Sequence, residues 1–566
     1  MGRVVRKRIR ARARLLVLAV AGAVALVALP SPAPAAQRDC KQPRGKHEPP
    51  CNPALAASPW GASHRGSYAQ GSSPFRGLES SRARTKHLDL PGIPISIQFS
   101  GRYDDGGRAA WGSLIDSGDR QALFKVDAGT GELIDLYEPE AREGKTPEGE
   151  GGITGAYNML DRNGRFIVPR QRWLDVYKDS VKGDRSSPIK LRKRFRLPGR
   201  AFCGDADRLV GAAMTYEGFI AFATERGVVG TVPGRPTAMR KGRLRAVNLN
   251  EGRCQAPDDQ LETVSNNIAV DERGGIYVVT SERMRRLNHD AKRNRLARRW
   301  SAPYDTGSEV SEIRLGAGSG STPSLMGTGR RQDRFVAITD GQDLMHMALF
   351  WRGGVPKDFD GLGEGRRRRM ACEFPVRFGD PDARSSLSEQ SIAVRGYGTL
   401  HVNNALDYEF PPGLPDVLVN ALAALRGGDP NAAPYGAERI DWNPRKQRCE
   451  SVWAKPRISI PNGIPSISER SGLAYGIGQR GGEWGVRGLR WRDGRPKLFA
   501  PADNRPCSEQ ALAYLEEGGL LGILGPVLDE LPRSCENSVY AATEIGPGRS
   551  IWTGTFLGLT IYEPRR

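Results

Sequence analysis

The chain has 566 residues, of which 38% are hydrophobic and 26% charged, and its formal net charge at pH 7 is +20. This length and apolar content allow a large core, which excludes an intrinsically disordered chain. Beyond an N-terminal leader, no stretch is apolar enough to span a membrane, so we expect a soluble globular protein.

Residues 1–36 have the pattern of a signal peptide. Seven arginines and lysines precede an apolar run from Leu15 to Leu29, and the small-residue sequence "PSPAPAAQ" follows it. A basic, an apolar and a small-residue region in this order is typical of cleavable secretion signals. We expect cleavage after Ala35 or Ala36, and a secreted or periplasmic protein. The leader has no acid, so its removal lowers the formal net charge from +20 to +13.

Residues 37–95 are expected to form an N-terminal arm that precedes the repeats. Eight cysteines remain after cleavage, and an even number of cysteines in an exported chain favours disulfides. The sequence alone does not fix their connectivity. Pairing between neighbours is the favoured hypothesis: Cys40 with Cys51, Cys203 with Cys254, Cys372 with Cys449, and Cys507 with Cys535.

A local pattern recurs from residue 96 to 566. A polar turn, a glycine and an apolar strand occur in "DRNGRFIV" (161–168), "TYEGFIAFAT" (215–224), "DERGGIYVVT" (271–280), "RGYGTLHVNN" (395–404), "SERSGLAYGIG" (468–478) and "IGPGRSIWTGT" (545–555), and without the glycine in "RQDRFVAITD" (331–340). A short apolar stretch precedes each, and a second pair of strands often follows. Each unit is therefore predicted to be four short strands joined by Gly, Asp and Asn turns.

A sheet of four short strands cannot bury both of its faces alone. Several such sheets packed around an axis cover one another, as in a β-propeller. With a further unit near 107–134, the pattern predicts an all-β domain over 96–566 with eight blades, seven being the alternative. Long loop insertions are expected at 353–385, 405–437 and 503–535.

Four segments resemble a family of exported bacterial PQQ-like β-propellers. They are "CGDADRLVGAAMTYEGFIAFATERGVVGTV" (203–232), "VSNNIAVDERGGIYVVTSERMRRL" (264–287), "GSGSTPSLMG" with "FVAITDGQDLMHMALFWR" (318–352), and "NSVYAATEIGPGRSIWTGTFLGLTIYE" (537–563). The resemblance extends over roughly 200–566. It implies the fold and an extracytoplasmic location, and it transfers no catalytic residue. More loosely, "NNIAVDERGGIYVV" is similar to strands of gluconolactonase and regucalcin-like propellers, which bind a divalent cation in the central channel.

Polar residues that open the innermost strands are expected to face this channel, where propellers usually bind ligands. The ligand-binding candidates are Tyr157, Asn158, Asn266, Thr322 and Asn403. Amide and carboxylate oxygens suit Ca²⁺, and the candidate metal ligands are Asn266, Asn403, Glu536 and Asn537. The alternative is that these side chains only satisfy backbone groups of turns.

Three residues are candidates for proton transfer. Asp340 and Glu389 could act as the acid of a lactonase-like hydrolase in which a bound cation polarises a carbonyl. His401 is the histidine best placed to act as a general base, because Asn403 follows it closely. The competing interpretation is an ordinary turn for Asp340 and a packed side chain for His401.

No strong catalytic motif accompanies these candidates. The chain has no G-x-S-x-G, and no adjacent cysteine pair of the kind that quinoprotein alcohol dehydrogenases stack against their quinone, so PQQ is not expected. The densest basic run, Arg366 to Arg369, is interpreted as a solvated loop. We expect an exported monomer that binds a small molecule, glycan or protein partner at the channel mouth, and neither nucleic acid nor a membrane. A calcium-assisted hydrolase is the alternative, and a quinone-dependent oxidoreductase a weaker one.

Overall fold

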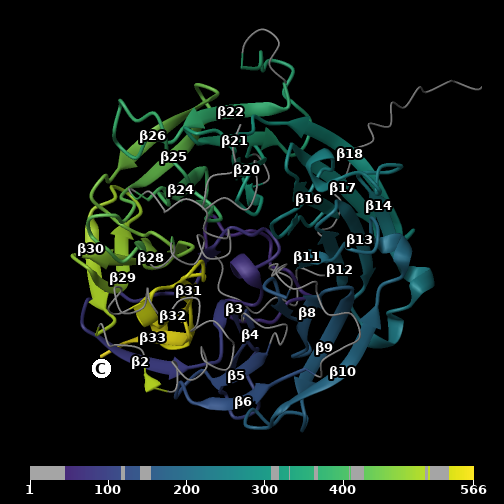
Figure 1. The fold of residues 1–566 in the computed structure, drawn as a ribbon, viewed down its shortest axis with the longest axis horizontal. Coiled ribbons are helices and arrows are strands. Elements are labelled where there is room, and N and C mark those ends of the chain that lie inside the picture. The colour runs from purple at the N-terminus through teal and green to yellow at the C-terminus, as the bar shows by residue number, and fades with distance from the viewer. Residues whose placement is uncertain are drawn as a thin grey trace, which may run out of the picture. The chain divides into compact units, whose positions relative to one another are not determined.

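The computed structural model describes residues 45–115, 122–139, 155–307, 318–329, 332–362, 368–406, 408, 423, 426–503, 508–509 and 534–565. The strands of these residues form eight sheets, and Figure 1 shows the sheets arranged around a common axis. This arrangement confirms the prediction of an all-β propeller with eight blades. The outer strand of each blade lies at the rim and the innermost strand at the axis.

The first four blades follow one another along the chain. Blade 1 contains β3 (Ile93–Phe99), β4 (Ala109–Ile115), β5 (Leu123–Asp127) and β6 (Leu133–Tyr137). Blade 2 contains β7 (Met159–Leu160), β8 (Phe166–Arg170), β9 (Trp173–Asp179) and β10 (Ile189–Arg196). Blade 3 contains β11 (Leu209–Met214), β12 (Phe219–Thr224), β13 (Val228–Pro233) and β14 (Arg245–Asn248). Blade 4 contains β15 (Ala269–Val270), β16 (Gly275–Val279), β17 (Arg283–Asp290) and β18 (Arg295–Pro303).

The last four blades include two strands from the N-terminal arm. Blade 5 contains β19 (Ser324–Met326), β20 (Phe335–Thr339), β21 (His346–Trp351) and β22 (Met370–Pro375). Blade 6 contains β23 (Ala393–Arg395), β24 (Gly398–Val402), β25 (Ala437–Asn443) and β26 (Arg448–Ala454). Blade 7 contains β27 (Ser466–Ser468), β28 (Leu473–Arg480), β29 (Glu483–Arg490) and β30 (Pro496–Pro501), with β1 (Ser72–Ser73) added inside. Blade 8 contains β31 (Glu544–Ile545), β32 (Ile551–Thr555), β33 (Gly558–Pro564) and β2 (Ala83–Asp89).

Several short helical segments of the described residues are single 3₁₀ turns. They are η2 (Ser63–Arg65), η3 (Gly199–Ala201), η4 (Pro236–Ala238), η5 (Lys241–Arg243), η6 (Asp258–Gln260), η7 (Ser534–Glu536) and η8 (Pro547–Arg549). Within the described ranges, no helix has the length and apolar content needed to cross a bilayer.

The recurring glycine of the sequence pattern lies in the turn between the first and second strands of a blade. Gly164, Gly218 and Gly274 have φ values of 68°, 79° and 77°, a left-handed conformation that favours glycine. At Gly274 a Cβ atom would lie 2.3 Å from the backbone oxygen of His289. This turn therefore excludes a side chain on steric grounds as well.

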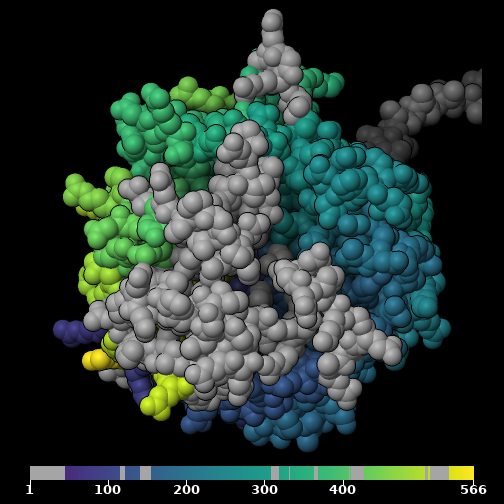
Figure 2. All heavy atoms as spheres, viewed as in Figure 1, coloured from purple at the N-terminus to yellow at the C-terminus, as the bar shows by residue number. Residues whose placement is uncertain are grey.

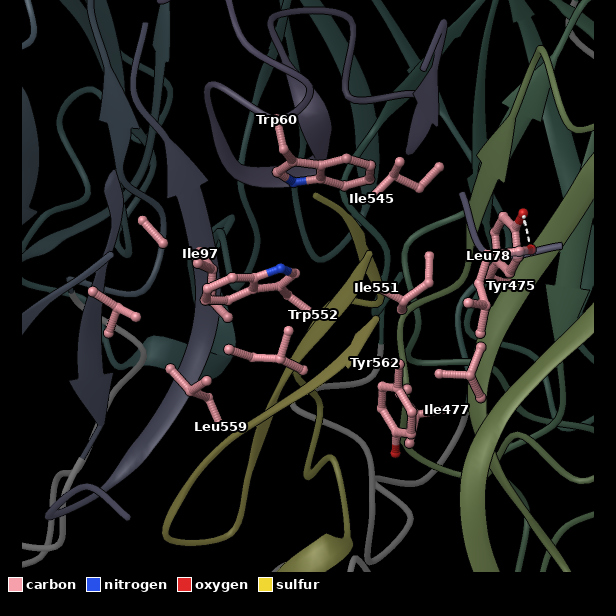
Figure 3. Packing of buried hydrophobic residues seen from close by; sticks show 14 of the residues in the cluster. Trp60, Leu78, Ile97, Tyr475, Ile477, Ile545, Ile551, Trp552, Leu559 and Tyr562 are labelled. Carbon is pink, nitrogen blue, oxygen red and sulfur yellow. Dashed lines mark hydrogen bonds between the residues drawn. The ribbon is translucent and has the colours of Figure 1, made fainter. Parts of the chain in front are cut away.

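Neighbouring blades bury each other's faces. Every residue of β12 is buried, whereas exposed residues recur along the outer strand β10, so each blade becomes more polar towards the rim. One core cluster joins blades 7, 8 and 1 with the arm. Figure 3 shows part of it, with Trp60 of the arm near Ile545, and Trp552 of blade 8 near Ile97 of blade 1.

The ring closes through an N-terminal strand. β2 pairs antiparallel with β33, in register from Ala83 opposite Pro564 to Asp89 opposite Gly558. The sequence pattern predicts this strand as part of an arm that ends at residue 95. In the structure, 83–89 forms the outer strand of blade 8, and blade 1 begins at Ile93.

Two predicted disulfides are confirmed. Cys203 is bonded to Cys254 and Cys372 to Cys449, with Cα–Cα distances of 4.9 Å and 6.1 Å. Cys51 and Cys535 are also disulfide-bonded. Their predicted partners, Cys40 and Cys507, lie outside the described residues.

Candidate functional site

The N-terminal arm runs through the centre of the ring, where Figure 1 shows the purple start of the coloured chain. Backbone N–H groups of successive innermost strands donate to successive arm carbonyls. The bonds run from Val270 N to Ser67 O at 2.6 Å, Leu325 N to Tyr68 O at 2.9 Å, Val394 N to Gln70 O at 2.8 Å, and Ile467 N to Gly71 O at 2.8 Å. The arm thus follows blades 4, 5, 6 and 7 around the axis.

The earlier part of the arm bonds to the first three blades. Phe99 N donates to Trp60 O at 2.7 Å, and Leu160 N donates to Gly61 O at 2.8 Å. In blade 3, Met214 O accepts from Asn52 Nδ2 at 2.8 Å and from Ser67 Oγ at 2.7 Å. These bonds connect the arm to blades 1 to 7, and its strand β2 pairs with β33 of blade 8. The arm also brings its own side chains to the axis.

His64 is one of these side chains. It lies in η2 with φ 54° and ψ 32° and is 4% exposed. Its Nε2 is 3.0 Å from Thr322 Oγ1 of blade 5 and 3.4 Å from Ser391 Oγ of blade 6. Burial lowers the pKa of His64 to about 4, so the imidazole is neutral at pH 7.

Tyr157 of blade 2 lies beside this histidine, with ring centroids 5.8 Å apart. The Tyr157 hydroxyl donates to Asn266 Oδ1 of blade 4 at 3.3 Å. Asn266 Nδ2 in turn donates to Ser319 O at 3.3 Å. Burial raises the pKa of Tyr157, and the charge of Glu389 raises it further, so the phenol is neutral at pH 7.

Glu389 introduces a carboxylate into the same region. It is half-buried and precedes β23. A Cβ atom on Gly320 would lie 2.1 Å from Glu389 Oε2, so the carboxylate packs directly against the backbone of Gly320. Burial is the main cause that raises the pKa of Tyr540, and the charge of Glu389 raises this pKa further. We name His64, Tyr157, Asn266, Thr322, Glu389 and Ser391 the axial cluster.

Four residues of the axial cluster were candidates from the sequence, namely Tyr157, Asn266, Thr322 and Glu389. The other two, His64 and Ser391, were missed. Asn158, also a candidate, lies beside the cluster and holds the arm, since its backbone O accepts from Ser63 N at 3.1 Å. Its Nδ2 donates to Ser113 Oγ at 2.7 Å.

The remaining catalytic candidates lie elsewhere. Asp340 follows β20 and accepts from His346 N at 2.7 Å, and its Oδ2 is 3.0 Å from His346 Nδ1. Burial lowers the pKa of His346, but the hydrogen bond and charge of Asp340 outweigh burial and raise it. His401 is buried within β24, where Nε2 is 3.0 Å from Thr399 Oγ1 and burial lowers its pKa to about 3.

The other metal-ligand candidates have separate hydrogen-bond partners. Asn403 Nδ2 donates to Tyr435 O at 3.0 Å, and Asn403 Oδ1 accepts from Ala405 N at 3.1 Å. Glu536 Oε1 is 3.0 Å from His87 Nδ1. Asn537 Oδ1 accepts from Asn462 Nδ2 at 2.8 Å. Among the described residues, no group of three or more His, Cys, Asp or Glu side chains could hold a metal ion, and calcium at these positions stays a prediction.

Comparisons with known proteins agree with the fold. No family model matches the chain. It is 40% identical over 513 residues to an uncharacterised protein of Archaeoglobus fulgidus, and the aligned region covers 90% of this chain and 88% of that protein. Two solved structures are similar, the quinohemoprotein alcohol dehydrogenases of Comamonas testosteroni and of Pseudomonas putida HK5. For each, the TM-score is 0.52, the identity 12%, and the coverage 90% of this chain and 80% of the other. At this identity the likeness concerns the fold alone.

Proposed function

The chain belongs to the same family as the uncharacterised protein of Archaeoglobus fulgidus, and we propose that it is an exported propeller that binds a small, uncharged, hydroxyl-rich molecule at the axial cluster. The observation that carries this proposal is that polar side chains of the arm and of blades 2, 4, 5 and 6 gather at the axis. Convergent polar groups of this kind give a site its specificity.

The chemistry of the cluster favours hydroxyl groups over charged ones. His64 and Tyr157 are neutral at pH 7, and Asn266, Thr322 and Ser391 both donate and accept hydrogen bonds. The aromatic ring of Tyr157 adds an apolar surface of the kind that packs against C–H groups. Glu389 can accept two hydrogen bonds from neighbouring hydroxyls.

Isothermal titration calorimetry against a panel of monosaccharides, disaccharides and polyols tests this proposal. We expect at least one panel member to bind, and Tyr157→Phe to weaken its binding about tenfold through the loss of one hydrogen bond. Tyr103→Phe is the matched control, because the Tyr103 hydroxyl also donates to a side chain, Asp179, but away from the axis. A panel without a binder, or equal losses in both variants, would contradict the proposal.

The metal-assisted hydrolase is a second candidate. Its support is Glu389, the one predicted catalytic residue at the axis, whereas Asp340 is paired with His346. Metal analysis of the purified protein, with hydrolysis of a lactone panel before and after chelation, distinguishes the two candidates. Stoichiometric calcium with activity that chelation and Glu389→Gln both abolish would favour the hydrolase. A metal-free folded protein that binds its ligand unchanged would exclude it.

A quinone cofactor does not fit the axial cluster. Pyrroloquinoline quinone carries three carboxylates, which need cationic partners, whereas Glu389 would repel them. The arm also places His64 at the axis, where it contacts Thr322. We therefore derive no quinone chemistry for this chain.

Export rests on the leader pattern and the disulfides. Cys203–Cys254 and Cys372–Cys449 fit an oxidising compartment. Cell fractionation with N-terminal sequencing of the mature protein tests the proposal. We expect an extracytoplasmic protein that begins at residue 36 or 37.

A further inference from the structure

Positive charge is concentrated on the outer strands of three consecutive blades. The segments 190–200, 240–245 and 292–299 together contain fifteen Arg and Lys residues and no Asp or Glu. They include most of β10 of blade 2, the approach to β14 of blade 3, and most of β18 of blade 4. In contrast, β6 and β22, the outer strands of blades 1 and 5, each contain an acidic residue. We name the Arg and Lys residues of the three segments the basic rim.

The three segments form one continuous surface. Arg200, which follows β10, donates to the backbone oxygen of Lys241. Arg245 Nε donates to Asn294 O at 2.8 Å, which links blade 3 to blade 4. In Figure 1, β10, β14 and β18 lie along the right-hand side of the ring, and Figure 2 shows blue and teal surface on that side.

A hollow of about 710 Å³ lies between blades 3 and 4, and Arg200, Arg245 and Arg298 line it. Its one acidic residue, Glu251, is 3.8 Å from Arg298, and both side chains are more than half exposed, so the pair neutralises little charge. Lys241, Arg243, Arg295 and Arg299 are exposed. Within the described part of the chain, none of these four has a carboxylate in ion-pair range.

We infer that the basic rim binds an extended acidic polysaccharide. The basic rim extends over three blades, so it suits a long polymer chain with repeated carboxylates. Guanidinium groups bind carboxylates in bidentate geometry. A peptide that adds a strand at β14 is disfavoured, because Arg298 Nη2 already donates to Asn248 O at this edge.

A single-stranded nucleic acid held by base stacking and a membrane entered by apolar side chains are also disfavoured. Base stacking needs exposed aromatic rings, and membrane insertion needs exposed apolar side chains. Among the described residues, the exposed large hydrophobic side chains are Leu133, Val181, Tyr435 and Val452, and none lies in the three segments.

Binding of polygalacturonate to the full mature protein tests the inference. The rim variant carries Lys241→Glu, Arg243→Glu, Arg295→Glu and Arg299→Glu. The control variant carries four equivalent reversals of exposed residues in blades 6 and 7 or beside them, Arg445→Glu, Arg457→Glu, Arg495→Glu and Lys497→Glu. Both variants therefore have the same net charge, and circular dichroism verifies that both are folded.

We expect the wild-type protein to bind polygalacturonate at low salt and to release it as salt screens the charges. The rim variant should bind about tenfold more weakly, since each reversal removes a modest exposed contact, and the control variant should bind almost as the wild type does. Equal losses in the two variants would overturn the inference, because net charge alone would then explain binding. Tighter binding of polyglutamate, duplex DNA or anionic vesicles would overturn it in favour of that partner.

Discussion

Replacing Trp60 with alanine tests whether the N-terminal arm stabilises the ring. Trp60 is 1% exposed and belongs to the core cluster that joins blades 7, 8 and 1. Within the described residues its indole Nε1 has no hydrogen-bond partner, so the substitution removes packing alone. The backbone bond from Phe99 N to Trp60 O does not involve the side chain. Loss of a buried tryptophan costs about 3–5 kcal/mol when the cavity does not collapse.

Equilibrium urea unfolding followed by circular dichroism measures this loss. Trp173→Ala is the control, because Trp173 is half-buried at the start of β9 and packs against Arg196 near the rim. We expect the control to lose less than half as much free energy of unfolding. If Trp60→Ala loses no more than Trp173→Ala, or if trypsin removes the arm from the folded wild-type protein without destabilising it, the arm does not stabilise the ring.

Three further predictions concern pH, backbone conformation and covalent linkage. Burial lowers the pKa of His401 to about 3 in the folded protein, whereas in the unfolded chain this imidazole is protonated below about pH 6.5. The unfolded state therefore gains a proton between pH 7 and pH 5 that the folded state does not bind. The free energy of unfolding should fall by about 2 kcal/mol over this interval on account of His401. Urea unfolding at the two pH values should show a weaker dependence in His401→Gln, and an unchanged dependence would refute the argument. Gly274→Ala should destabilise the protein more than Gly164→Ala. Both residues have positive φ, but a Cβ atom at Gly274 would clash with the backbone oxygen of His289, whereas one at Gly164 would meet open space. Equal melting temperatures of the two variants would show that the clash is relieved. Replacing Cys372 and Cys449 with serine should cost about 2–5 kcal/mol in urea unfolding under oxidising conditions, and a loss below this range would show that packing alone holds the two blades.

The sequence was sufficient to predict the blades because the signals that define them are local. Apolar strands of the correct length and turn glycines repeat within each unit, and the structure gives Gly164, Gly218 and Gly274 the positive φ that such turns need. The path of the arm could not be predicted in this way. It bonds to backbone atoms of all eight blades. Every residue has a backbone carbonyl, so no residue pattern in the sequence indicates these bonds.

The candidate site was predictable only in part, for a positional reason. Tyr157, Asn266 and Thr322 precede innermost strands, and this position alone brings them to the axis. Asp340 and Asn403 were chosen because they follow apolar strands, but β20 and β24 are second strands, so both residues lie further out. His64 was missed because its partner Thr322 lies 258 residues away, and no local pattern in the arm indicates such a contact.

The basic rim, like the blades, results from a sequence pattern that recurs with the repeat. The longest uninterrupted basic run, Arg366 to Arg369, lies outside the basic rim, and in the rim segments Arg and Lys residues are interspersed with neutral residues. The three rim segments begin at residues 190, 240 and 292, so they recur at roughly the length of one blade. Each therefore occupies the same place in its own unit, at or beside the outer strand, and closure of the ring brings the three together. A repeat protein can thus build an extended charged surface from short basic segments that lie far apart in the sequence, and we expect such surfaces wherever charge recurs with the period of the repeat.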